Sequence, residues 1–377
     1  MSGHTNEGAA VRIFHIKADN FTELAELPEV LPPQGFVWVG SGRREFEVQR
    51  GEIQAALQRW AGAALVDLHV SDLLNNQLPS HFEDTSWYDM LVFRRLATTP
   101  SGKSLFLDES HGTLASAQQA LDAIDTSPVG FAVFDRVLLT IHPTDCMVRE
   151  FFAQRLTQQA AESDLRGAGR LPSGPADLML RMVNYMVDSY LDLRRLLTRQ
   201  LTTLQTELLN PKGHFHDWQV LLGSRNALHM LEDTCEDQRA AMQEWIDALD
   251  EWPSEADAGA KRERELLRVR SRDVLEHIER VLTHVRRLES SAEAAVQMHF
   301  SALSHRTNDI MRTLTVLTAI FLPLNLITGI FGMNFEVIPL QHAVKGFWVA
   351  IAIMIATAVG LGGFFWRKRY LGTHVRP

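Results

Sequence analysis

The sequence predicts an α+β fold, in which an N-terminal α/β domain is followed by a long helical stalk and two C-terminal transmembrane helices. Three observations lead to this prediction. Short β-type runs alternate with helical stretches up to about residue 145. Beyond residue 175 the chain has only two clusters of helix-breaking residues before the apolar segments begin. Two long uncharged apolar segments lie in the last fifth of the chain.

Residues 1–165 form the predicted α/β domain. Helices are expected at Glu52–Ala61 and Leu114–Ile124, and a further helix runs from about residue 145 through Leu165. A turn-rich stretch, Arg166–Pro175, closes the domain. The predicted strands are Val11–Lys17, Gly35–Gly40, Ala64–Val70, Tyr88–Ala97, Ser104–Leu107 and a pair within Val129–His142.

Residues 176–311 form the predicted stalk region, a helix hairpin followed by a long stalk helix. The hairpin helices are expected at Ala176–Leu209 and Asp217–Asp250, and each is followed by a segment that contains proline. The stalk helix begins near Ala260, and its first proline is Pro323. This helix is therefore expected to continue into the first apolar segment, and residues 260–331 would measure roughly 108 Å as one helix.

Two segments are long enough to cross a bilayer. Residues 314–331 comprise 18 residues without a formal charge, and residues 346–366 comprise 21. We predict the first membrane helix at 312–331, an external loop at 332–345 and the second helix at 346–366. The alternative, a pair of helices buried in a soluble core, is disfavoured because such helices are usually shorter or amphipathic.

Basic residues predict the orientation of the two membrane helices. Arg306 and Arg312 precede the first helix, and Arg367–Arg369 begin a basic tail at 367–377, whereas the loop carries only Lys345 and Glu336. Because basic residues stay on the inner side, both termini are expected in the cytoplasm. The N-terminus has no apolar run of the kind that a signal peptide needs. We therefore expect a multi-pass protein of the inner or plasma membrane.

The composition argues against several classes of function. The formal net charge is −9, which disfavours nucleic acid as a partner and suits a protein that handles cations, although many soluble proteins are equally acidic. The two cysteines, Cys146 and Cys235, form no CxxC pair, as expected in a reducing compartment. No specific catalytic motif is found, so neither enzymatic activity nor an organic cofactor is expected.

One face of the first membrane helix is suited to line a water-filled pore. Two helices cannot enclose such a pore, so several copies of the chain would have to surround a shared axis. Asn325 falls near mid-membrane, where an unpartnered polar side chain is costly; a wet pore would relieve that cost, and so would a hydrogen bond between helices. The residues of this face recur at steps of three or four: Asn308, Met311, Thr315, Thr318, Leu322, Asn325 and Gly329.

The first membrane helix ends in the tripeptide Gly332-Met333-Asn334. The stretch Phe321–Phe335, FLPLNLITGIFGMNF, resembles the end of the pore helix in the CorA family of divalent-cation (Mg²⁺) channels, whose signature is Gly-Met-Asn. The family usually has Thr where this chain has Asn325. Because the tripeptide lies between two C-terminal spans and before a basic tail, the resemblance is specific.

The resemblance extends upstream into the stalk and the α/β domain. Residues 272–277, RDVLEH, are similar to the family's stalk motif, in which the Asp helps to bind regulatory Mg²⁺; here that residue is Asp273. Residues 69–76, HVSDLLNN, resemble more loosely the segment that supplies a partner acid, here Asp72, and they are about two residues shorter than the family pattern. The alternative for each acid is a solvated surface charge.

The resemblance implies a ring-shaped homo-oligomer of five subunits in the lipid bilayer, with Mg²⁺ as both permeant and regulatory ion. Carboxamides of Asn334 would meet a hydrated ion at the mouth; the alternative for Asn334 is a helix C-cap. Rings of Met311 and Leu314 would close the pore by dewetting, or these side chains would only pack against lipid and helices. Asp273 of one subunit and Asp72 of the next would share Mg²⁺ when the cytoplasm is replete.

Three functions are compatible with these residues. The first is a channel for Mg²⁺, with Co²⁺ and Ni²⁺ as further permeant ions, and either influx or efflux as its direction. The second is a Zn²⁺ transporter of the same superfamily, whose members usually carry a variant of the tripeptide. The third is a membrane-tethered, non-conducting regulatory protein, which the polar face of the first membrane helix disfavours.

Overall fold

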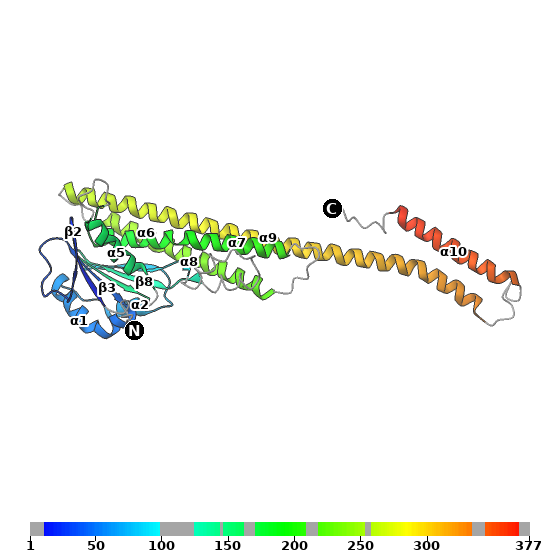
Figure 1. Cartoon of the computed structure of the whole chain (residues 1–377), viewed down its shortest axis with the longest axis horizontal. Helices are drawn as coiled ribbons and strands as arrows, with labels where there is room; N and C mark the ends of the chain where they lie inside the picture. Colours follow the sequence, from blue (N-terminus) through cyan, green and yellow to red (C-terminus); the bar gives the residue numbers. More distant parts are fainter. Residues whose placement is uncertain are drawn as a thin grey trace, which may run out of the picture. The chain divides into compact units, whose positions relative to one another are not determined.

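The computed structural model describes residues 11–98, 124–143, 146–161, 170–208, 218–252, 258–333 and 344–368. The chain divides into two compact units, Met1–Glu293 and Ala294–Pro377. The first unit contains a mixed sheet and most of the helices, and the second contains the apolar C-terminal helices (Figure 1).

A seven-stranded sheet with strand order β2-β1-β3-β9-β8-β5-β4 organises the first unit. Strands β3 and β9 pair in parallel, and the other neighbouring strands of this sheet pair antiparallel. A small second sheet pairs β6 (Ala97–Thr98) with β7 (Ile124–Asp125). The strands of the large sheet are β1 (Arg12–Lys17), β2 (Asn20–Leu24), β3 (Phe36–Gly42), β4 (His81–Asp84), β5 (Asp89–Arg94), β8 (Pro128–Val133) and β9 (Val137–His142).

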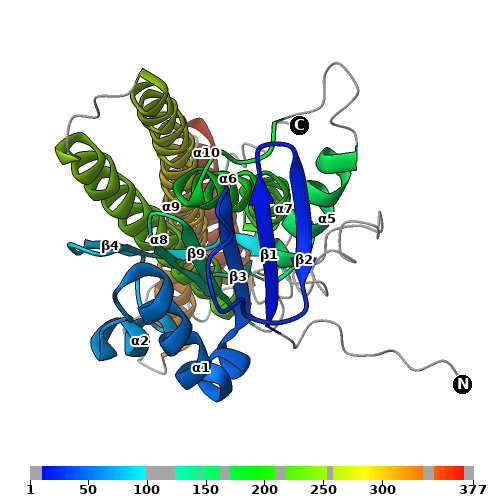
Figure 2. The ribbon, with the colours of Figure 1, turned by 90° about the vertical axis from the view of Figure 1, so that its left-hand side faces the viewer.

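Both faces of the large sheet are covered by helices. Alternate residues of β3 enter two different cores, because successive side chains of a strand point to opposite faces: Phe36 and Trp38 enter one core, and Val37 and Val39 the other. Helices α1 (Arg43–Ala61) and α2 (Asp67–Leu74) cover one face, whereas α5 (Val148–Ala161) and α6 (Pro175–Asp188) cover the opposite face (Figure 2).

Three long helices extend the core on the α6 side. Helices α7 (Tyr190–Leu208), α8 (Trp218–Glu251) and the part of α9 (Ala258–Phe331) before residue 293 contribute buried leucine, valine and tryptophan side chains to it. The indole of Trp245 donates a hydrogen bond of 2.8 Å to the hydroxyl of Ser271, and its ring meets Phe82 of β4 edge-on at 5.7 Å. Strand β4 is thereby fixed against α8.

The second unit consists of the remainder of α9 and helix α10 (Val344–Arg367). Both helices are long and apolar enough to cross a membrane, and only 6% of the apolar span of α9 and none of that of α10 is buried. A core helix of a soluble protein would be mostly buried, so the exposed apolar surface favours a lipid environment. Helix α9 passes through Pro323 without a break, which confirms the prediction of one continuous helix.

Several predicted elements differ from the structure. The predicted strand Ala64–Val70 is wrong: helix α2 starts at Asp67, and its Val70 and Leu73 pack on the sheet at helical spacing. The predicted helix Ala176–Leu209 is two helices, because a turn at Ser189 separates α6 from α7.

Other predicted elements are confirmed, missed or untested. Strands near β1, β3, β8 and β9 and helix α8 are confirmed, whereas β2 and β4 were not predicted. Helix α1 begins at Arg43, ahead of the predicted start at Glu52. The predicted strand Ser104–Leu107 lies outside the described residues, as does the predicted helix Leu114–Ile124 except for Ile124, which belongs to β7.

Candidate functional site

Eight residues predicted to line or gate a pore share one face of the C-terminal half of α9. At about 100° per residue they fall within an arc of about 120°. Every one of them is exposed, including Met311 (57%), Leu314 (56%) and Leu322 (66%). By contrast, Val316 lies on the other side of the helix and is buried. The eight residues, called the polar stripe below, are Asn308, Met311, Leu314, Thr315, Thr318, Leu322, Asn325 and Gly329.

The hydroxyl groups of the polar stripe present oxygen acceptors. The hydroxyl of Thr315 donates to the carbonyl of Met311 at 2.7 Å, and that of Thr318 donates to Leu314 at 2.9 Å. Because each proton is used on the helix backbone, the oxygen lone pairs remain available to accept from water. The polar stripe therefore offers neutral oxygen atoms, which suit the hydration shell of a cation without binding it tightly.

Helix α9 ends at Phe331, one residue before the tripeptide Gly332-Met333-Asn334. The N–H of Gly332 donates to the carbonyl of Thr328 at 2.9 Å, and a Cβ at Gly332 would lie 3.0 Å from that oxygen. Among the described glycines only Gly35 and Gly62 have a positive φ, so Gly332 is not a left-handed helix cap. The N–H of Met333 donates to Ile330 at 3.3 Å, and Asn334 lies outside the described residues.

Asp273 lies on α9 at a hollow of about 330 Å³ that α5 and α6 also line. Its carboxylate is exposed and lies 3.9 Å from Nε2 of His277, whose Nδ1 lies 3.4 Å from the carboxylate of Asp188. Arginines 181 and 270 line the same hollow, and burial lowers the pKa of both guanidinium groups. Asp273 is thus placed where its charge can reach an ion or a neighbouring molecule.

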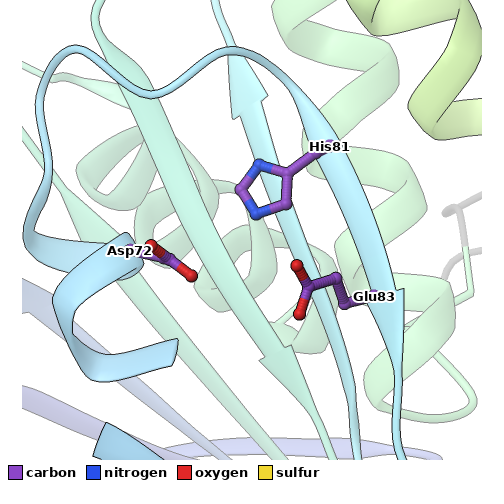
Figure 3. A group of neighbouring side chains, drawn as sticks. All are labelled: Asp72, His81 and Glu83. Carbon is purple, nitrogen blue, oxygen red and sulfur yellow. The ribbon is translucent and has the colours of Figure 1, made fainter. Parts of the chain in front are cut away.

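Asp72 lies in a different set of side chains. It extends from α2 toward His81 and Glu83 of β4, and one potential ligand atom from each residue lies within 4.8 Å of the others (Figure 3). Asp273 is not part of this group, so the structure of one chain does not join the two predicted regulatory acids. His81 and Glu83 were not predicted from the sequence; their only signal was the spacing of two residues on a short strand.

The sequence matches the family described as CorA-like Mg²⁺ transporter protein over residues 104–369, which is more than two thirds of the chain. The chain therefore belongs to this family. The predicted resemblance to CorA is confirmed.

Individual relatives match over shorter segments. The cobalt/magnesium transport protein CorA of Thermotoga maritima is 34% identical over 100 residues, which is 26% of this chain and 28% of the relative. The magnesium transport protein CorA of Haemophilus influenzae is 32% identical over 101 residues, which is 27% of this chain and 32% of the relative. The chain thus spans less than a third of the length of these two curated relatives.

Solved structures share the fold over nearly the whole chain. The complete structure of the CorA magnesium transporter from Methanocaldococcus jannaschii has a TM-score of 0.70 at 19% identity, covering 95% of this chain and 98% of that chain. The full-length CmaX protein has a TM-score of 0.58 at 17% identity, covering 98% of this chain and all of the other. This likeness confirms an N-terminal α/β domain, a long helix and two C-terminal apolar helices.

Proposed function

We propose that this chain is one subunit of a pentameric, ring-shaped channel that conducts Mg²⁺, with Co²⁺ and Ni²⁺ as further permeant ions, across the inner or plasma membrane. Both termini and the first unit lie in the cytoplasm, as the basic residues beside the membrane helices favour. The family membership and the names of the curated relatives support divalent-cation transport.

The strongest support for this proposal is the polar stripe on α9. A helix that only anchors a protein has no need for asparagine and threonine on one face at regular spacing. The polar stripe is exposed in the single chain. If several copies of α9 surround an axis, their polar stripes can all face one water-filled pore. The oxygens of the polar stripe carry no formal charge, so a hydrated Mg²⁺ would be favoured enough to enter and still free to leave.

The proposed mouth and gate of the pore are assigned to α9 and to the tripeptide that follows it. Carboxamide oxygens of Asn334 would meet the hydrated ion at the mouth, beside Gly332 and Met333, whose N–H groups still bond to carbonyls of the last turn of α9. Met311 and Leu314 lie on the polar stripe toward the cytoplasmic end of the apolar span, and both are exposed. Rings of these side chains would close the pore by excluding water.

Cysteine labelling tests whether the polar stripe faces water. A Thr318→Cys variant is expected to react with a charged, water-soluble thiol reagent and to lose flux, because its thiol lines the aqueous path. An Ile320→Cys variant is the matched control, since it lies two residues away and about 160° around the helix. Both native cysteines are buried and should not react. Equal labelling of the two variants would contradict the proposed orientation.

Regulation by cytoplasmic Mg²⁺ is proposed to act through Asp273 of one subunit and Asp72 of the next. Bound Mg²⁺ would hold neighbouring subunits together, and without it the carboxylates would repel one another and loosen the ring. The exposure of Asp273 at the edge of the α5–α6–α9 hollow supports this role, because its carboxylate is accessible to a second chain.

An Asp273→Lys variant is expected to conduct at the same rate in high and in low cytoplasmic Mg²⁺, because the introduced ammonium replaces the ion. Uptake into vesicles of fixed internal Mg²⁺ measures this. Glu279→Lys makes the same charge change at another exposed position of α9 and should keep the inhibition. Retained inhibition in the Asp273→Lys variant would remove Asp273 from the regulatory site.

A further inference from the structure

The side chains of Asp72, His81 and Glu83 converge within one subunit. His81 and Glu83 are two residues apart on β4 and therefore share a face of the strand, and Asp72 approaches them from α2 (Figure 3). The intervening residue, Phe82, is buried on the opposite face against Trp245 of α8. Packing of Phe82 thus fixes the orientation of β4 about its own axis and places His81 and Glu83 on the face covered by α2.

Hydrogen bonding prepares His81 to act as a ligand. Its Nδ1 lies 3.1 Å from the carbonyl oxygen of Pro79. A carbonyl only accepts, so Nδ1 carries the hydrogen and Nε2 presents a lone pair. Within the described part of the chain Nε2 has no hydrogen-bond partner, and the ring is directed toward the two carboxylates (Figure 3). Histidines that bind metals in proteins are usually oriented by such a bond from the other ring nitrogen.

A second chain of hydrogen bonds positions Glu83. The Nε2 of His69 lies 2.8 Å from a carboxylate oxygen of Glu83, and its Nδ1 lies 2.7 Å from the hydroxyl of Tyr88. That hydroxyl accepts from the N–H of Val66 at 3.0 Å, which leaves its own hydrogen for His69. His69 and Tyr88 are buried, so these hydrogen bonds hold one carboxylate oxygen of Glu83 from the interior. The second carboxylate oxygen of Glu83 remains available to bind a metal ion.

We propose that Asp72, His81 and Glu83 form a binding site, within one subunit, for a first-row transition-metal dication such as Zn²⁺ or Co²⁺. Imidazole nitrogen and carboxylate oxygen are both donors that zinc accepts in proteins, and a set of three protein ligands leaves the fourth position open for water. Mg²⁺ prefers oxygen ligands alone, so the imidazole makes the site selective for the transition metal. Donor atoms around a tetrahedral zinc lie about 3.4 Å apart, and the present donor atoms, which lie within 4.8 Å of one another, would have to draw together to that value on binding.

The site has a consequence for gating that rests on the proposed function. Asp72 serves here as a ligand inside its own subunit, whereas the proposed Mg²⁺ regulation uses it between subunits. A transition-metal ion bound by His81 and Glu83 would therefore keep Asp72 from sharing Mg²⁺ with Asp273 of the neighbouring subunit. The channel would then respond to two kinds of dication through one carboxylate.

Co²⁺ titration of the purified full-length protein, in excess Mg²⁺, tests the site directly. The visible absorption of Co²⁺ changes in intensity and position when protein ligands replace water in a site of low coordination number, and the variants then identify which residues are ligands. The wild type is expected to bind one Co²⁺ per subunit at a site that His81→Ala and Glu83→Gln each weaken by about tenfold or more. Zn²⁺ is expected to raise the melting temperature of the wild type more than that of either variant.

His229→Ala is the matched control, because His229, Glu232 and Glu289 form another group of histidine and carboxylates in the described part of the chain. It should leave Co²⁺ binding unchanged. Wild-type affinity in both the His81→Ala and Glu83→Gln variants, or a loss that follows His229→Ala instead, would overturn the assignment. The Co²⁺ titration does not depend on ion flux. Wild-type protein that binds Co²⁺ but conducts no ions would therefore contradict the proposed channel function and leave this site standing.

Discussion

An Asn334→Ala variant is expected to lose Mg²⁺ flux by about tenfold or more while still assembling in the membrane. Each carboxamide oxygen at the mouth would accept a hydrogen bond from the hydration shell of the ion, whose water hydrogens point outward, and each such bond contributes about 0.5–1.5 kcal/mol. The loss of two of them already corresponds to about tenfold, since 1.4 kcal/mol is a factor of ten. Flux is measured with a Mg²⁺-sensitive dye inside vesicles.

Gln341→Ala is the control for this experiment, because it removes a carboxamide from the same loop outside the tripeptide. We expect it to retain most of the flux. If Asn334→Ala conducts as well as Gln341→Ala, Asn334 has no role at the mouth, and a helix cap becomes the better account of its position.

A Met311→Asp variant is expected to raise basal uptake several-fold at high cytoplasmic Mg²⁺. Met311 is 57% exposed on the polar stripe, toward the cytoplasmic end of the apolar span. A ring of its thioethers would exclude water from the closed pore, whereas a ring of carboxylates would stay hydrated and attract cations. Uptake into vesicles loaded with Mg²⁺ measures the leak of the closed state.

The matched control for the gate is Ile310→Asp. Ile310 is the neighbouring residue, is similarly exposed at 63%, and points about 100° away from Met311 around α9. The same charge at this position should not open the pore. An equal leak in both variants would show that a carboxylate at this depth disrupts the helix, and Met311 would lose its role as gate.

The features that depend on local sequence could be predicted. Continuity of α9 followed from the lack of proline between Pro253 and Pro323, and the polar stripe followed from helical spacing alone. The run Ala64–Val70 was misassigned because a short apolar run does not distinguish a strand from a helix. The structure places Asp67 in the first turn of α2, where a negative charge is favourable.

The turn between α6 and α7 could not be predicted, since it depends on a tertiary contact. The hydroxyl of Ser189 lies 2.6 Å from the carbonyl of Met186 and 3.0 Å from that of Leu96, which is distant in the sequence. The first contact competes with helical hydrogen bonding, and the second fixes the turn against the strand region.

The side chains that surround Asp72 could not be predicted from the sequence either. Asp72 belongs to α2 and its neighbours to β4, an edge strand of only four residues. Their convergence depends on the pairing of β4 with β5 and on the burial of Phe82 against α8. The sequence identified one acid by family resemblance, whereas the fold supplied the imidazole and the second carboxylate that change its chemistry.

Several copies of α9 are proposed to surround a water-filled path for Mg²⁺. The decisive experiment is reconstitution of the purified protein into vesicles with a Mg²⁺ gradient and an imposed potential. We expect saturable Mg²⁺ entry that stops when internal Mg²⁺ rises. Vesicles that stay impermeable to Mg²⁺ would contradict it, and entry of Zn²⁺ alone would favour the zinc transporters of the superfamily instead.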